Sequence, residues 1–190
     1  CNEKNVNVQQ LIPILPSVYT SDLNKKVDYL KVFNSLNLPT NKKIIFYPAG
    51  YWAHKNHKYI IDAAKNLKDS NIHDYLFIFC GFDMGNHNYV EKLINTYGLK
   101  DHVISFKFLT TLEIISLYKY CNAVVMPTYG GPTNLPIFES FFFKKPIFYT
   151  SNLLKDKKIS NNLIEIDILN INDFILKLQF LENKPFIKKL

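Results

Sequence analysis

The chain has 190 residues, of which 47% are hydrophobic and 21% are charged. This balance is typical of a folded globular protein, argues against intrinsic disorder, and allows one domain or two small ones. The sequence contains no run of the ~18–20 apolar residues that a membrane-spanning helix needs. It begins with a polar segment and without an initiator methionine, so we expect it to be part of a longer protein.

The formal net charge is +7, and all 23 basic residues are lysines. Arginine is the preferred residue for reading base edges and for stacked contacts with nucleic acids. Because arginine is absent, we expect no nucleic-acid partner. A surface that weakly attracts nucleotide phosphates or anionic lipids remains, so a peripheral association with the inner face of a membrane stays open.

The three cysteines do not have the spacing of a metal site. Cys80 ends one apolar run and Cys121 precedes another, so we expect both thiols to be buried and reduced. This use of cysteine favours a cytoplasmic location.

The first part of the chain is less regular than the rest. Leu11–Val18 contains two prolines and is expected to be an extended connector. Apolar residues at helical spacing predict a helix over Asp22–Leu36. We therefore expect residues 1–41 to form an interdomain connector with a lead-in helix, and residues 42–190 to form the domain proper.

From Lys43 onward, short apolar runs alternate with segments of helical periodicity. The predicted strands are Ile44–Tyr47, Tyr75–Cys80, Val103–Phe106, Ala123–Met126, Pro146–Tyr149 and Leu163–Ile166. The predicted helices are Tyr59–Leu67, Tyr89–Tyr97 with Gly98 as its cap, Leu112–Tyr120 after a capping box of Thr110 and Glu113, Leu135–Phe143 and Ile171–Leu181. This alternation predicts an α/β fold in which helices cover both faces of a parallel sheet, with ligands at the carboxyl ends of the strands.

The loop after the first predicted strand, residues 48–57, contains the only tryptophan, two histidines and Lys55. A lysine where a strand passes into a helix is well placed to neutralise a phosphate, to which the helix N-terminus adds backbone N–H donors. The alternative is a solvated lysine beside an aromatic lid on the core, and composition alone slightly favours that alternative.

The loop after the fourth predicted strand, residues 127–134, is rich in glycine, threonine and asparagine. Its two adjacent glycines allow close approach of a ligand, and Thr133 and Asn134 can cap the next helix or donate to an anion. Glu139 then lies one turn into a helix with apolar flanks, where a carboxylate needs a partner. The two hydroxyls of a ribose would be one partner; a solvent-facing position near Lys144 or Lys145 is the alternative.

These two loops resemble the donor-binding half of retaining glycosyltransferases of the GT-B fold, in the large family 4 group (glycosyl transferases group 1). That family carries a segment of the form E-G-F-G-L-P-x-x-E, and residues 131–139 here read GPTNLPIFE. The segment YPAGYWAHKNH at residues 47–57, with Pro127–Tyr129, is similar to a bacterial branch that includes mannosyltransferase-like polysaccharide enzymes. The resemblance covers about Ile12 to Asn183 and implies a Rossmann-like, three-layer α/β/α domain that is the C-terminal half of a GT-B enzyme.

The resemblance also implies roles for individual residues. Lys55 would contact the donor diphosphate and Glu139 the ribose hydroxyls, and these two would be the catalytic residues. The nucleotide sugar would further contact a set of loop residues and backbone groups, with the base at the end of the third strand: Gly50, His54, Phe106, Gly131, Pro132, Thr133, Asn134 and Leu135.

Two family positions differ in this chain. Gly131 replaces the first glutamate, which in the family touches the transferred sugar, and the usual arginine before the lysine falls at Ala49 or Gly50. No metal cofactor is expected, because Asp-x-Asp is absent and His54 and His57 have no third ligand nearby in sequence. The other histidines, His73, His87 and His102, are predicted to lie on the surface.

By the resemblance, the chain is the nucleotide-sugar donor-binding domain of a glycosyltransferase of polysaccharide biosynthesis. The enzyme would transfer a hexose, with mannose as one candidate, to a glycan or lipid-linked acceptor. An N-terminal acceptor domain would precede residue 1, so the isolated domain would bind its donor weakly and transfer nothing. A sugar-nucleotide epimerase, which a product assay would reveal, and a non-catalytic binding module without nucleotide affinity are the alternatives.

Overall fold

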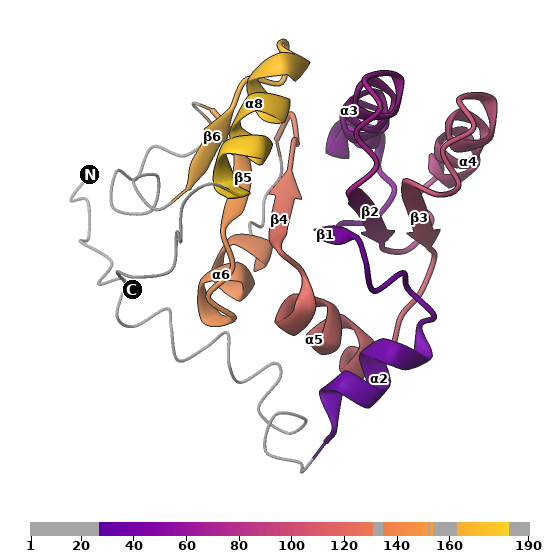
Figure 1. The fold of residues 1–190 in the computed structure, drawn as a ribbon, viewed down its shortest axis with the longest axis vertical. Coiled ribbons are helices and arrows are strands. Elements are labelled where there is room, and N and C mark those ends of the chain that lie inside the picture. Colours follow the sequence, from indigo (N-terminus) through magenta and orange to yellow (C-terminus); the bar gives the residue numbers. More distant parts are fainter. Residues whose placement is uncertain (1–26, 131–134, 152, 154–162, 183–190) are drawn as a thin grey trace, which may run out of the picture.

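The centre of the fold is one parallel six-stranded sheet with the strand order β3-β2-β1-β4-β5-β6 (Figure 1). The computed structural model describes residues 27–130, 135–151, 153 and 163–182. Its strands are β1 (Lys43–Pro48), β2 (Tyr75–Cys80), β3 (Val103–Phe106), β4 (Ala123–Met126), β5 (Ile147–Thr150) and β6 (Ile164–Ile166). Each predicted strand is present, and the largest error in a predicted boundary is one residue.

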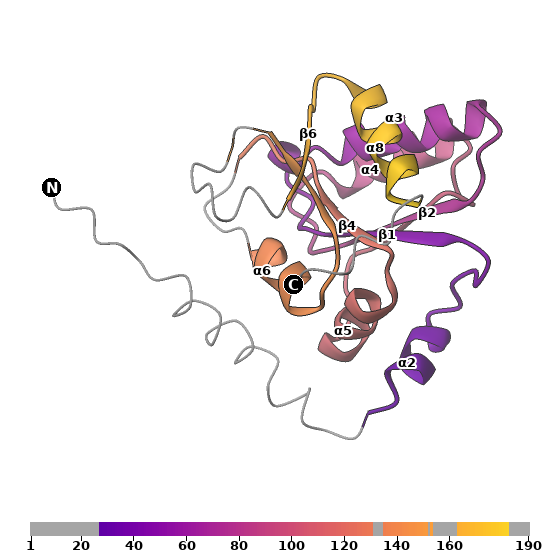
Figure 2. The same ribbon diagram turned by 60° about the vertical axis from the view of Figure 1, so that its left-hand side comes forward.

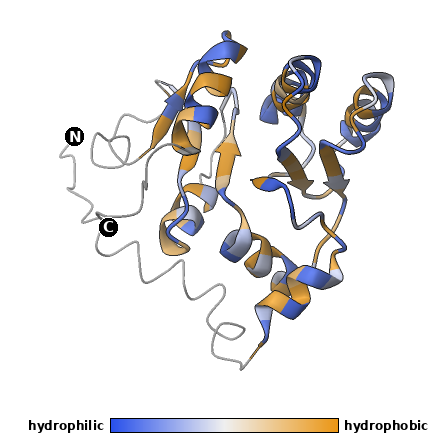
Figure 3. Cartoon of the chain, viewed as in Figure 1, coloured by the Kyte–Doolittle hydropathy of each residue, from blue (hydrophilic) through white to orange (hydrophobic). Residues whose placement is uncertain are grey.

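The central strands are buried on both faces, which explains their uninterrupted apolar sequences. Every residue of β2, β4 and β5 is buried. Figure 3 colours the ribbons of β2 and β4 as mostly hydrophobic. Such strands are expected in a parallel sheet that helices cover on both sides.

Helices form the two outer layers of the domain (Figure 2). One layer contains α3 (His57–Asp69), α4 (His87–Thr96) and α8 (Ile171–Glu182), and the other contains α5 (Thr111–Tyr120) and α6 (Leu135–Phe142). The lead-in helix α2 (Tyr29–Ser35) packs on α5, where Lys119 lies over the Tyr29 ring and Phe33 contacts Tyr120. The three-layer α/β/α prediction is therefore confirmed.

The helix ends follow the predicted capping chemistry. The Thr110 hydroxyl accepts from the Glu113 amide while the Glu113 carboxylate accepts from the Thr110 amide, which is the predicted capping box. Gly98 follows α4 with a φ of +61°, a left-handed conformation that glycine adopts without strain. Within the described residues, the lead-in helix α2 begins at Tyr29, and Asp28 caps it. The first part of the predicted helix, residues 22–26, lies outside the described residues.

The histidine predictions are partly wrong. His87 and His102 are buried rather than on the surface, and the ring of His102 hydrogen-bonds that of His73 at 3.0 Å between nitrogens. His54 and His57 do not share a helix face. Left-handed Asn56 separates them, so that His57 points into the core while His54 stays exposed.

The strand order reverses between β1 and β4, which are hydrogen-bonded neighbours at the middle of the sheet. At such a switch point the loops that follow the two strands lead to helices on opposite faces, and a crevice opens between them. The loops after β1 and β4 are the two that the sequence singles out. No helix among the described parts of the chain is long and apolar enough to cross a lipid bilayer.

Candidate functional site

The loop after β1 carries Lys55 at the end of a 3-10 turn, η2 (Ala53–Lys55), just before α3. Tyr47, a buried residue of β1, donates its hydroxyl hydrogen bond to the Lys55 carbonyl at 2.6 Å. The ring of His57, the first residue of α3, stacks on Tyr51 and also contacts Tyr47. The core therefore fixes the backbone that presents Lys55.

The loops after β1 and β4 are joined directly. The His54 carbonyl accepts hydrogen bonds from the Tyr129 amide at 2.9 Å and from the Thr128 hydroxyl at 3.2 Å. Thr128 is itself fully buried. Hydrogen bonds at the switch point thus connect the two loops that the sequence predicts to bind the ligand.

A cavity of about 470 Å³ opens above these loops, within the range of small-molecule sites. Its wall is built from the ends of β1 to β4 together with α5 and α6. Four of the predicted site residues line it: Gly50, Lys55, Leu135 and Glu139. The structure therefore brings Lys55 and Glu139, 84 positions apart in sequence, to the wall of one cavity.

Positive electrostatic features gather in this cavity. Burial lowers the pKa of Lys55 from its ordinary value, because a desolvated ammonium is less stable than a hydrated one. Lys107, which follows β3, is a second cation in the wall. Its Nζ lies 3.8 Å from Oδ2 of Asp83. Leu135 and Pro136, the first two residues of α6, line the cavity too, so the positive end of a helix dipole faces it.

Glu139 is held from below by a tyrosine of the neighbouring helix. It lies in the second turn of α6 and is partly buried, and the Tyr118 hydroxyl donates a hydrogen bond to its carboxylate. Glu139 is thus partly buried between the cavity and α5.

Exposed aromatic rings surround the cavity mouth. Phe82 and Phe108 are 69% and 63% exposed, although their ring centroids lie only 6.2 Å apart. Trp52 also lines the cavity and is 44% exposed. Exposed apolar surface gathered beside a cavity marks a binding site more often than a single exposed apolar residue does.

The other predicted site residues lie outside the cavity wall or outside the described residues. His54 is exposed and is not part of the described cavity wall; its described contacts are through its carbonyl and with the Trp52 ring. Phe106 ends β3, and its carbonyl accepts from Gly81 and Tyr51 just beneath the wall. Residues 131–134, including Gly131, Pro132, Thr133 and Asn134, lie outside the described residues.

Sequence reasoning missed Tyr118 and Lys107. Neither belongs to a motif, and each reaches the site only because its strand or helix lies beside another one in space. The capping box just after Lys107 marks where a loop passes into a helix, and it was the one local signal near that residue. Among the parts of the chain that the structure describes, no three His, Cys, Asp or Glu side chains gather as metal ligands would.

A family assignment follows from comparison with known proteins. Residues 28–164 match the sequence model of the Glycosyl transferases group 1 family. The chain belongs to this family. No curated protein matches the chain significantly.

Solved structures of glycosyltransferases and of a sucrose-phosphate synthase have the same fold as this domain. A glycosyltransferase from Rickettsia africae matches with a TM-score of 0.72 at 20% identity, over 84% of this chain and 42% of that one. Sucrose-phosphate synthase from Thermosynechococcus elongatus gives 0.67 at 18% identity, over 82% and 40%. The C-terminal domain of the glycosyl transferase group 1 protein LpcC from Francisella tularensis gives 0.66 at 19% identity, over 83% of each chain.

These likenesses establish the fold as that of the C-terminal domains of GT-B glycosyltransferases. The chain spans less than half the length of the Rickettsia enzyme and of the sucrose-phosphate synthase, but most of the length of the LpcC domain. The Glycosyl transferases group 1 domain of this chain therefore corresponds to one part of those longer proteins.

Proposed function

We propose that this domain binds the nucleotide-sugar donor of a retaining glycosyltransferase. The observation that carries the proposal is that Lys55 and Glu139 line one cavity at the switch point of the sheet. Open α/β sheets bind nucleotides at this place, outside the carboxyl ends of the strands. The similar structures include a glycosyltransferase and a sucrose-phosphate synthase, which supports this class of reaction.

The chemistry of donor cleavage fits the charges of the cavity. When the bond between sugar and phosphate breaks, negative charge builds up on the leaving diphosphate. Lys55 and the N-terminus of α6 would stabilise that charge without reorganising, and Lys107 would add a second cation. Lys107 could thereby compensate for the arginine that the family usually carries at Ala49 or Gly50. The proposal needs no bound metal ion.

Glu139 would bind the ribose of the same nucleotide, because a carboxylate accepts hydrogen bonds from two adjacent hydroxyls. The base would lie near the end of β3, beyond Phe106. The enzyme would transfer a hexose, with mannose as one candidate from the similarity of residues 47–57, to a glycan or lipid-linked acceptor. That acceptor would be held by a further domain, so we expect the isolated domain to transfer nothing.

A non-catalytic binding module is the second candidate function. It is favoured by Gly131, which stands where the family has the glutamate that contacts the transferred sugar. A module of this kind would have lost the cleavage chemistry and retained the fold. Turnover by the full-length protein would exclude it, and the products of that turnover would distinguish a transferase from a sugar-nucleotide epimerase.

Calorimetric titration tests donor binding. UDP, GDP and ADP are titrated into the wild-type chain, Lys55→Ala and Glu139→Ala, with Lys58→Ala as the matched control. Lys58 is an exposed lysine of α3 that pairs with Asp62 outside the cavity wall. We expect one diphosphate to bind, and each site variant to weaken it about 10- to 100-fold, the worth of one charged hydrogen bond.

Lys58→Ala should bind that nucleotide as the wild type does. The proposal fails if none of the three diphosphates binds. It also fails if the best ligand binds Lys55→Ala or Glu139→Ala as tightly as it binds the wild type.

A further inference from the structure

Tyr118 is a buried polar group that touches the carboxylate of the site. It lies on α5 and is 0% exposed. Its hydroxyl donates a hydrogen bond to Glu139, which lies on the neighbouring helix α6 and lines the cavity. A phenol that donates to a carboxylate makes a hydrogen bond stronger than one between neutral groups.

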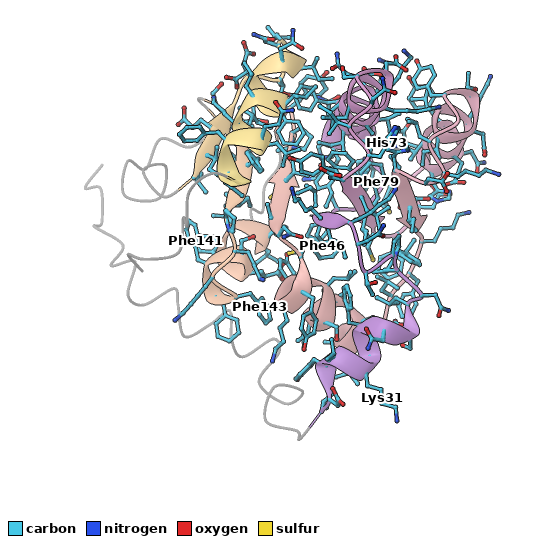
Figure 4. The ribbon with its side chains drawn as sticks, in the orientation of Figure 1. Lys31, Phe46, His73, Phe79, Phe141 and Phe143 are labelled. Atoms are coloured by element: carbon cyan, nitrogen blue, oxygen red, sulfur yellow. The ribbon has the colours of Figure 1, made fainter. Side chains whose placement is uncertain are left out.

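Aromatic packing fixes the Tyr118 ring. The Phe46 ring meets it edge-on, with 5.2 Å between ring centroids and 82° between planes. The Phe143 ring stacks on it at 5.1 Å and 12°. Phe46 on β1 is labelled beside the sheet in Figure 4, and Phe143, which follows α6, is labelled beside that helix. The hydroxyl therefore stands at one fixed point beneath the site.

A glutamate side chain has several rotatable bonds, so its carboxylate can take several positions relative to the helix. A fixed donor selects the rotamers that bring the carboxylate to it. Since Glu139 lies in a cavity wall, the selected position also decides where its acceptor oxygens meet a ligand. An ionised carboxylate offers about four lone-pair sites, so it can accept from Tyr118 and from a diol at the same time.

We propose that Tyr118 is a positioning residue that orients Glu139 toward the 2′- and 3′-hydroxyls of the donor ribose. This inference rests on the proposed function and adds to it the group that sets the preference for a ribonucleotide. Tyr118 does not touch the nucleotide. Its effect is transmitted through Glu139 and is confined to the sugar end of the ligand.

The test compares ribonucleotides with their 2′-deoxy counterparts. Wild type, Tyr118→Phe and Glu139→Asp are titrated with UDP, GDP and ADP and with dUDP, dGDP and dADP. Tyr118→Phe keeps the ring, with its contacts to Phe46 and Phe143, and removes only the hydroxyl. We expect it to lose about tenfold in ribonucleotide affinity and less in affinity for the 2′-deoxynucleotide, which offers Glu139 only the 3′-hydroxyl, since one charged hydrogen bond no longer orders the carboxylate.

Tyr59→Phe is the matched control, because this buried tyrosine donates to the Asp167 carbonyl, away from the cavity. It should keep the wild-type ratio of ribonucleotide to deoxynucleotide affinity. Glu139→Asp leaves the buried ring intact and shortens the carboxylate by one methylene, so it should lower the ratio as Tyr118→Phe does. In a Glu139→Ala background, Tyr118→Phe should have no further effect on the ratio.

The inference is overturned if Tyr118→Phe or Glu139→Asp keeps the wild-type ratio, or if Tyr118→Phe lowers the ratio further in the absence of Glu139. Its failure is distinct from failure of the proposed function. If the proposed function fails, the wild type binds none of the six nucleotides, or Lys55→Ala binds the best one as tightly as the wild type does.

Discussion

Gly81 stands where two loops of the site approach most closely. A Cβ atom added to it would lie 2.3 Å from the Ala49 carbonyl oxygen and 2.5 Å from the Gly50 nitrogen. Both are backbone atoms of the loop that leads to Lys55, so neither can move without shifting that loop. The absence of a side chain at one position thus sets the separation of the β1 and β2 loops at the cavity wall.

We predict that Gly81→Ala destabilises the domain by about 1–3 kcal/mol, the usual cost of forcing an extra methyl into a packed site. Gly50→Ala is the control, because a Cβ there would meet its neighbours at 3.4–3.5 Å, which is ordinary contact. Urea unfolding of both variants measures the difference. Equal stability of Gly81→Ala and Gly50→Ala would show that the loops separate freely.

At the scale of elements, the sequence was most informative where burial is simplest. Strands covered on both faces appear as apolar runs, so the sequence predicts Tyr75–Cys80 and Ala123–Met126 with their observed bounds. Capping residues located the start of α5 and the end of α4 for a similarly local reason. A strand order, in contrast, depends on which strands pair, and no local pattern shows that β1 lies beside β4.

The candidate site was predictable to the same extent. Lys55 and Glu139 were chosen because each follows a strand, and parallel strands end at one edge of a sheet. Tyr118 could not be chosen, since its contact with Glu139 depends on how α5 and α6 pack. His87 and His102 were misplaced because polar flanking residues resemble a surface, whereas in the fold their rings meet Ser105 and His73.

The β1–α3 connection contains a buried histidine that should make stability depend on pH. His57 begins α3 and is fully buried, and burial lowers its pKa to about 3. In the unfolded chain its pKa is about 6.5. Above that value both states hold a neutral ring; below it only the unfolded chain binds the proton, so the free energy of unfolding falls as the pH falls.

We predict a loss of about 1.4 kcal/mol per pH unit from His57 between about pH 6 and pH 5. His102, whose pKa burial also lowers, should add to the loss. Urea unfolding at several pH values gives the slope. His57→Phe should flatten it, whereas exposed His54→Phe should retain it; an unchanged slope in His57→Phe would place the pH dependence elsewhere.

At the scale of the whole molecule, the cavity is assembled from residues between Pro48 and Glu139, and so from the ends of four strands and from helices of one layer. A ligand there touches elements that are distant in sequence, and it can bind only when these strands and helices are assembled. Binding should therefore stabilise the entire domain rather than one loop.

We predict that the diphosphate that binds best raises the melting temperature by about 5–10 °C at one hundred times its dissociation constant, which corresponds to about 2.7 kcal/mol. The reason is linkage: the folded chain binds the ligand and the unfolded chain does not. Differential scanning fluorimetry measures the shift, with the matching nucleoside as control. Because the nucleoside lacks the phosphates that Lys55 and Lys107 would meet, it should give a much smaller shift. An equal shift by the nucleoside would mean that Lys55 and Lys107 do not anchor the ligand. A diphosphate shift of the same size in Lys55→Ala would mean that Lys55 does not anchor it.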